Sequence, residues 1–196
     1  MKRFASNTEF EFIPARRMLL VGGLGAVAYG IIAGKTRAFG EAAPASGMVS
    51  IENFDAAGKS LGVAQVSKVV KSDGEWRQML SPESYDITRR AGTERAGTGK
   101  YAYNHTDGLY HCICCSTPLY DSKTKFESGT GWPSFWQPIS EKNIAKASDR
   151  SFGMVRDAIS CTRCDAHLGH VFDDGPKPTG LRYCMNSVAL NFVARA

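Results

Sequence analysis

Cysteine is the residue type with the clearest chemical potential in this 196-residue chain, which contains six of them. Four form two Cys-x-x-Cys pairs, Cys112 with Cys115 and Cys161 with Cys164. Two such pairs can direct four thiolates at one ion, which is the tetrahedral shell of a structural zinc site. The alternative is two disulfides, as exported proteins often carry. We favour zinc, because closely spaced pairs of this kind more often bind metal or exchange thiols than serve as covalent links.

Cys184 belongs to neither pair and is the candidate nucleophile. The thiolate is the reactive form of cysteine, and nearby positive charge or hydrogen-bond donors lower the pKa of a thiol. Arg182, His167 and His170 are the candidates for this charge. Cys114 also lies outside the pairs, but it stands between two expected ligands, so we interpret it as a small filler residue.

Strands and turns are expected to position these residues. After Gly99 the sequence consists of short runs rich in Tyr, Phe, Val and Ile, broken by Gly, Pro, Asp and Ser, which is typical of strands and turns. Each cysteine pair lies between strand-like segments, in residues 109–120 and 158–172. Val188, Leu190 and Phe192 recur at every second position, which predicts a strand directly after Cys184. Zinc would then join two hairpin-like pieces.

Two short helices are predicted before the strands. Ser72 and Glu75 have the spacing of a capping box, followed by apolar residues at helical spacing. Ser81 and Pro82 repeat the start signal, with proline at the first helical position, and Gly92 is a plausible end.

Residues 1–45 are interpreted as an export signal of the twin-arginine type. Arg16 and Arg17 directly precede the apolar run Met18–Ala33, and small residues follow at 43–45. The run is shorter than the roughly 20 residues that a membrane span needs, so we expect cleavage, with an uncleaved anchor as the alternative. This interpretation predicts a periplasmic protein whose zinc is loaded in the reducing cytoplasm before export.

Charge argues against nucleic acid as a partner. The formal net charge of +5 falls by three when residues 1–45 are removed, since they hold six basic and three acidic residues. What remains shows no concentrated basic stripe. Residues 46–70 are interpreted as a linker or lightly ordered arm, and residues 71–196 as one domain, expected to be a monomer.

Five segments together resemble a single family, over roughly residues 68–193. These segments are Gly92–Arg95, Ser128–Phe135, His167–Phe172, Asp174–Gly180 and Arg182–Ser187. On them the chain resembles the methionine-R-sulfoxide reductases of the B type. The resemblance implies a mainly β fold of two antiparallel sheets, with short N-terminal helices and a structural site for one zinc ion. It also implies reduction of the R epimer of methionine sulfoxide, in proteins or peptides, by Cys184 passing through a sulfenic acid.

The resemblance further implies roles for single residues. His167 and His170 belong to the active site, where histidine suits proton donation. Trp132 and Arg182 would contact the substrate, with the indole as a wall for its methyl group. Asn186, two residues beyond the nucleophile, would act from the same face of the strand, on the substrate or on a histidine. Without the resemblance, the histidines would be interpreted as structural.

Thr130 stands where many members of this family have a second, resolving cysteine. Oxidised Cys184 would then be reduced directly by an external thiol, such as a thioredoxin-like protein, or by Cys114 as an unusual resolver. We favour the external thiol. Two other hypotheses are a zinc-ribbon-like binding module and a redox-inactive structural relative. Labelling of Cys184 by iodoacetamide and the activity of Cys184→Ser distinguish them.

Overall fold

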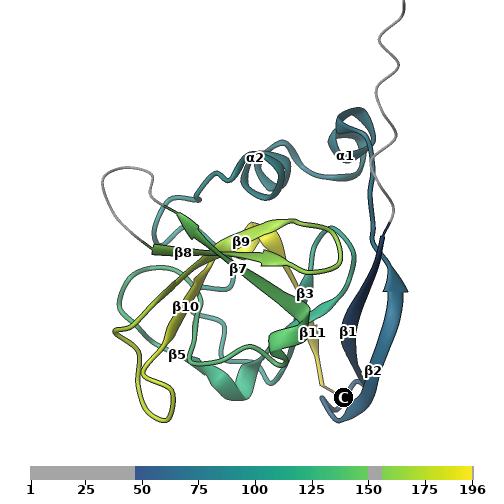
Figure 1. The fold of residues 1–196 in the computed structure, drawn as a ribbon. Helices are drawn as coiled ribbons and strands as arrows, with labels where there is room; N and C mark the ends of the chain where they lie inside the picture. Colours follow the sequence, from purple (N-terminus) through teal and green to yellow (C-terminus); the bar gives the residue numbers. More distant parts are fainter. Residues whose placement is uncertain (1–46, 150–155, 196) are drawn as a thin grey trace, which may run out of the picture. The chain divides into compact units, whose positions relative to one another are not determined.

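The computed structural model describes residues 47–149 and 156–195 (Figure 1). The predicted export signal, residues 1–45, lies outside this described part of the chain. None of the helices within it combines the length and the apolar character that crossing a bilayer requires.

The largest sheet has six antiparallel strands in the order β5-β6-β10-β9-β8-β7. In that order the strands are Lys125–Phe126, Ser134–Phe135, Arg182–Met185, His167–Phe172, Arg156–Cys161 and Ile144–Asp149. The candidate nucleophile Cys184 therefore lies in β10, in the interior of the sheet, between β6 and β9. A residue on an interior strand is held by ladders on both sides, which makes it a rigid support for chemistry.

A second sheet has three antiparallel strands in the order β11-β3-β4, spanning Leu190–Ala194, Gly108–Cys112 and Pro118–Asp121. Aromatic residues from the two sheets form much of the core. Tyr120 of β4 stacks on Phe135 of β6 with ring centroids 4.4 Å apart, and Tyr110 of β3 meets the same ring edge-on at 5.1 Å. All three side chains are fully buried, so they hold the two sheets together by apolar burial and ring geometry.

The two predicted helices are present as α1 (Asp73–Met79) and α2 (Pro82–Arg90). Ser72 and Glu75 form the expected capping box, which satisfies backbone N–H groups that the first turn leaves without partners. Helix α2 ends in a left-handed residue at Ala91, one position before the predicted Gly92. Figure 1 shows α2 lying over the β8–β9 side of the large sheet, where it buries one face of the helix.

A β-hairpin occupies most of the segment that was expected to be a linker or arm, residues 46–70. Its strands are β1 (Met48–Phe54) and β2 (Ser60–Ser67), and Ile51 of β1 is buried. The hairpin is held by Asn143 of the 3-10 turn η2 (Glu141–Asn143). The Asn143 carboxamide accepts from the backbone N–H of Glu52 at 2.8 Å and donates to the Glu52 carbonyl at 2.9 Å, as a neighbouring strand would. This long-range contact explains why a segment with a weak local signal is ordered.

The C-terminal strand begins later than predicted. A 3-10 turn, η4 (Ser187–Ala189), separates β10 from β11, so Val188 lies in the turn and not in the strand. The buried carboxylate of Glu94 accepts the backbone N–H groups of Ser187 and Val188, which are therefore not available to a sheet ladder. Another 3-10 turn, η1, spans Ser122–Thr124. The prediction of a mainly β fold with antiparallel sheets and short N-terminal helices is confirmed, with the hairpin as an additional sheet.

Candidate functional site

The four predicted zinc ligands lie together. Cys112 and Cys115 are at the β3–β4 turn, Cys161 and Cys164 are at the β8–β9 turn, and their sulfur atoms all lie within 4.8 Å of one another. The two turns have matching backbones. In each, the residue after the second cysteine has a positive φ, 59° at Ser116 and 56° at Asp165, and its N–H donates to the carbonyl of the first cysteine. Two tight knuckles therefore point four thiols at one centre.

A zinc ion fits this centre. Zn–S bonds of about 2.3 Å in a tetrahedron require sulfur–sulfur separations of about 3.8 Å. The Cys112–Cys164 and Cys115–Cys161 pairs lie at 3.6 Å and 3.5 Å. These distances far exceed a disulfide bond of about 2.05 Å, and all six cysteines are free thiols. The four-cysteine zinc prediction is confirmed over the disulfide alternative. Cys114, the additional thiol beside this cluster, is buried.

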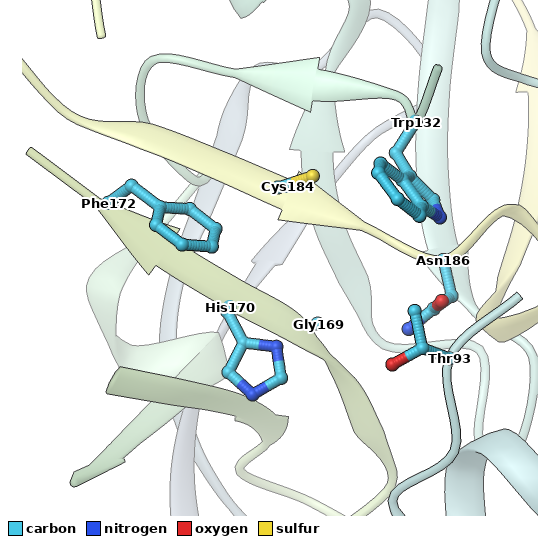
Figure 2. Close-up of a pocket in the computed structure, with 7 residues that line it drawn as sticks. All are labelled: Thr93, Trp132, Gly169, His170, Phe172, Cys184 and Asn186. Atoms are coloured by element: carbon cyan, nitrogen blue, oxygen red, sulfur yellow. The ribbon is translucent and has the colours of Figure 1, made fainter. Parts of the chain in front are cut away.

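Cys184 faces a separate cavity of about 110 Å³. Figure 2 shows the cysteine on β10 with its sulfur between two aromatic walls. The residues that line the cavity are Thr93, Trp132, Gly169, His170, Phe172, Cys184 and Asn186. Sites for drug-sized ligands are larger, about 300–1,000 Å³. This cavity suits one small side chain, and its half-buried cysteine is accessible to it.

His170 is directly opposite Cys184, because β9 and β10 pair these two residues in register. The rings of His167 and His170 are in edge-on contact, with centroids 5.2 Å apart. Strict alternation along a strand would place residues three apart on opposite faces. A bulge at Leu168 removes this conflict, since Ser160 of β8 pairs with His167 while the next residue back, Ile159, pairs with Gly169. The bulge therefore brings both histidines to the side of Cys184, where His170 lines the cavity and the His167 ring contacts that of His170.

Gly169 allows β9 to approach β10 this closely. A Cβ atom at this position would lie 2.1 Å from the carbonyl oxygen of Cys184 and 2.9 Å from the Cα of Met185. Both contacts are with backbone that cannot move without breaking the ladder. Any side chain at position 169 would therefore separate the histidine strand from the cysteine strand.

Burial raises the pKa of the Cys184 thiol above its ordinary value, and three neighbours partly oppose this effect. The largest opposing influence is the positive charge of Arg182, followed by hydrogen bonds from Thr130 and Ser134. Arg182 is two residues before Cys184 and so shares its face of β10. The site thus holds the cysteine mostly as a thiol at neutral pH, with a cation in place to favour the thiolate.

Arg182 is not among the residues that line the cavity. Its guanidinium donates two hydrogen bonds of 2.8 Å to the carboxylate of Asp174 and lies 4.3 Å from the centre of the Phe172 ring. The ion pair holds the pKa of Asp174 below its usual range. Arg182, predicted from the sequence as substrate-binding, is therefore placed to act on the charge of Cys184 and on the aromatic wall.

The hydroxyl groups of Thr130, Ser128 and Ser134 form a hydrogen-bonded row beside Cys184. The Thr130 hydroxyl is 4.0 Å from the Cys184 sulfur, and the Ser128 hydroxyl joins it to that of Ser134 at 2.8 Å and 2.7 Å. Ser134 is paired in register with Cys184 across the β6–β10 ladder. Thr130, which the family resemblance places at the position of a resolving cysteine, thus has its hydroxyl within reach of the Cys184 sulfur.

Trp132 and Asn186 are each fixed by the backbone. The indole N–H of Trp132 donates to the Glu94 carbonyl at 3.1 Å. The Asn186 carboxamide accepts from the Glu94 N–H at 3.0 Å and donates to the Leu168 carbonyl at 3.1 Å. Asn186 lies just beyond β10, and it still lines the cavity with Cys184, as its position two residues on predicted.

Three cavity residues received no role from the sequence: Thr93, Gly169 and Phe172. Phe172 is two residues after His170 on β9, so the period of a strand could have placed it on the same face. Thr93 lies in an irregular segment far from Cys184 in the sequence, and no local pattern brings the two together.

Comparison with known proteins decides the family. The SelR domain model matches residues 80–194. The chain therefore belongs to the SelR family. Curated relatives carry the name peptide methionine sulfoxide reductase MsrB. One from Pseudomonas fluorescens is 57% identical over 130 residues, which is 66% of this chain and 100% of the relative. One from Pseudomonas syringae is 56% identical over 131 residues, 67% and 100% of the two chains. One from Thioalkalivibrio sulfidiphilus is 57% identical over 123 residues, 63% and 90%.

This membership confirms the resemblance stated from the sequence. The SelR match covers α2, the zinc cluster and every residue that lines the cavity. The β1–β2 hairpin lies before the matched residues, so it is an addition outside the family domain.

Proposed function

We propose that this chain is a peptide-methionine (R)-S-oxide reductase, with Cys184 as its nucleophile. The observation that carries the proposal is the placement of a half-buried cysteine at a cavity for one small side chain, opposite a histidine and beside an indole. Membership of the SelR family and the MsrB names of its relatives support the same activity.

The chemical step is transfer of one oxygen atom. The Cys184 thiol loses its proton and attacks the sulfoxide, the S–O bond of the substrate breaks, and an S–O bond forms on Cys184. The substrate sulfur is reduced by two electrons and leaves as methionine, while Cys184 is oxidised by two electrons to the sulfenic acid. The proton balance closes, because the proton released by the thiol is returned to the departing oxygen.

His170 is the proposed donor of that proton. It lies across the strand pair from Cys184 and lines the cavity, and a histidine titrates close to working pH. His167, in ring contact with His170, would hold its orientation and share its proton. Trp132 and Phe172 would form the apolar walls that accept the methyl group and the thioether sulfur. Asn186 would complete the polar side of the cavity.

An external thiol is the proposed reductant. Two thiol groups convert the Cys184 sulfenic acid to the thiol and release one water and one disulfide. Thr130 cannot supply either thiol, and Cys114 is buried beside the zinc cluster, where its thiol contacts Cys112 and Cys164. A thioredoxin-like protein suits this role.

Consumption of separated sulfoxide epimers tests the activity. The zinc-loaded chain, given dithiothreitol and a peptide with one methionine sulfoxide, should consume the R epimer and leave the S epimer. Cys184→Ser should abolish this reaction, since serine is a far weaker nucleophile at sulfur. Cys114→Ala is the matched control and should retain both zinc and activity. Consumption of neither epimer by the zinc-loaded wild type would refute the proposed function.

We propose that the protein is exported to the periplasm and works there as a monomer. Support comes from Arg16-Arg17, from the apolar run after them and from the small residues that follow. The oxidised proteins of that compartment would be its substrates. Fractionation of cells that express the full chain or Arg16→Lys/Arg17→Lys tests the location, and retention of the wild type in the cytoplasm would refute it. Gel filtration of the purified chain tests the monomer.

A further inference from the structure

Glu94 is a buried carboxylate in the wall behind the cavity, only 3% exposed. It lies in an irregular segment, next to the cavity residue Thr93. Burial of a charged side chain is costly unless hydrogen bonds compensate it. Each of the two carboxylate oxygens of Glu94 accepts one backbone N–H, that of Ser187 at 2.8 Å and that of Val188 at 3.2 Å.

The backbone of Glu94 contacts the cavity residues themselves. Its N–H donates to the carboxamide oxygen of Asn186, and its carbonyl accepts the indole N–H of Trp132. These two residues come from segments far apart in the sequence, and Glu94 is the residue that both of them meet. In Figure 2 the Thr93 and Asn186 side chains lie next to each other at the Trp132 side of the cavity.

The side-chain and backbone contacts of Glu94 together connect η4 to the Trp132 and Asn186 side chains. The carboxylate binds η4 immediately after Asn186, which fixes the position of Glu94 relative to β10. The backbone of Glu94, held in this way, then orients the Asn186 carboxamide and the Trp132 indole. Helix α2 supports the same turn from another side, since the Ser84 hydroxyl donates to the Val188 carbonyl at 2.9 Å.

We propose that Glu94 is a positioning residue for the reductase, one that sets the substrate wall formed by Trp132 and Asn186 without touching the substrate. The inference rests on the proposed function. It separates two parts of the site, since the nucleophile on β10 is held by the β6 and β9 ladders and not by Glu94. Loss of the Glu94 carboxylate should therefore weaken substrate recognition while the reactivity of Cys184 is retained.

Glu94→Gln is the principal test. The amide keeps one acceptor, but its NH₂ group meets a backbone N–H that also donates, so one of the two contacts with η4 is lost. We expect KM for the R epimer to rise at least about tenfold, which corresponds to about 1.4 kcal/mol of lost binding. The pH profile of Cys184 alkylation by iodoacetamide should stay within about twofold of wild type. Glu83→Gln, which changes an exposed carboxylate on α2, is the control and should have wild-type KM.

Hydrogen exchange measured by NMR reports directly on the hydrogen bond between the Trp132 indole and the Glu94 carbonyl. Hydrogen exchange of the Trp132 indole N–H, identified by its absence in Trp132→Phe, should become faster in Glu94→Gln, while the other two indoles are unchanged. In a double-mutant cycle, the effects of Glu94→Gln and Trp132→Phe on KM should be less than additive, because both remove the same orientation of the wall.

Three results would overturn the inference. One is a wild-type KM with unchanged indole exchange in Glu94→Gln. Another is an equal loss of alkylation rate and of kcat/KM, which would mark a purely structural role. If Glu94→Gln does not fold, Glu94→Asp keeps the charge at shorter reach, and a wild-type KM in that variant is the third. Failure of the wild type to consume the R epimer would instead refute the proposed function, so the two failures are distinguishable.

Discussion

Arg182 lies outside the cavity, and its positive charge partly opposes the effect of burial on the pKa of Cys184. From the sequence, Arg182 was a candidate for the positive charge near Cys184 and, through the family resemblance, for a substrate contact. The structure pairs its guanidinium with Asp174 and the Phe172 ring, both of which lie around the end of β9. No sequence pattern linked Asp174 to Arg182, so this ion pair could not be predicted. The four zinc ligands could be predicted from the count and spacing of the cysteines, and the same count singled out Cys184 as the proposed nucleophile.

Replacing Arg182 by methionine should raise the pKa of Cys184. The substitution keeps most of the apolar stem and removes the cation that favours the thiolate, so the midpoint of alkylation by iodoacetamide should move up by about one pH unit. The alkylation rate at pH 7 then falls about tenfold, since one pKa unit is a factor of ten in thiolate. Asp174→Asn keeps the cation and removes a neighbouring negative charge, so it should not raise the midpoint. An unchanged midpoint in Arg182→Met would show that the guanidinium does not act on Cys184.

Replacing Thr130 by cysteine should give the site an internal resolver. The Thr130 hydroxyl is 4.0 Å from the Cys184 sulfur, so a thiol at this position needs only a small shift to form a disulfide. With R sulfoxide and no added thiol, the wild type should stop as a sulfenic acid that reacts with dimedone. Thr130→Cys should instead lose two free thiols and fail to react with dimedone. Thr130→Ser is the control and should behave as the wild type. If Thr130→Cys contains no disulfide after one turnover, the expected geometry is wrong.

The elements differ in how far local sequence determines them. Helices α1 and α2 could be predicted from Ser72 and Ser81, because capping acts within four residues. The β1–β2 hairpin could not, because its order depends on Asn143, 91 residues from Glu52. The 3-10 turn η4 was missed for a similar reason, since the carboxylate that binds it belongs to Glu94.

Asn143→Ala should loosen the hairpin and leave the active site intact. The fully buried carboxamide bonds both backbone groups of Glu52 and also the Pro118 carbonyl, so its removal leaves buried polar groups without partners, at a cost of about 2–4 kcal/mol. Hydrogen exchange of the β1 amides should accelerate, while KM for the R epimer is unchanged. Gln65→Ala, on the exposed side of the same hairpin, should stay within about 0.5 kcal/mol of wild type. Unchanged exchange in Asn143→Ala would rule out this anchor.

At the scale of the whole domain, the zinc cluster links the two larger sheets. One cysteine pair belongs to the β3–β4 turn of the three-stranded sheet, and the other belongs to the β8–β9 turn of the six-stranded sheet. The stacked aromatic core joins the same sheets in the interior. Two Cys-x-x-Cys pairs could be predicted to share one ion, but which sheets they would join required the topology.

Removal of zinc should destabilise the domain as a unit. An ion bound at about a thousand times its Kd contributes about 4 kcal/mol, so chelation should lower Tm by about 10 °C. Unfolding should become less cooperative, because the turns that carry the cysteines lose their common centre. Calorimetry before and after a chelator measures both quantities, with Cys114→Ala as a control that retains the ion. An apo chain with the Tm of the zinc-loaded chain would show that the cluster does not stabilise the fold.

The bulge at Leu168 allows two histidines that are three residues apart to lie on the same face of β9. Alanine scanning would not reveal the role of the bulge, because a substitution leaves the number of residues in β9 unchanged. Deletion of Leu168 would leave the histidines two residues apart, so strict alternation would keep both on the side of Cys184. The deletion would instead remove a fully buried side chain and the carbonyl that accepts from the Asn186 carboxamide. A one-residue deletion at this bulge is therefore expected to disturb Asn186 more than the two histidines.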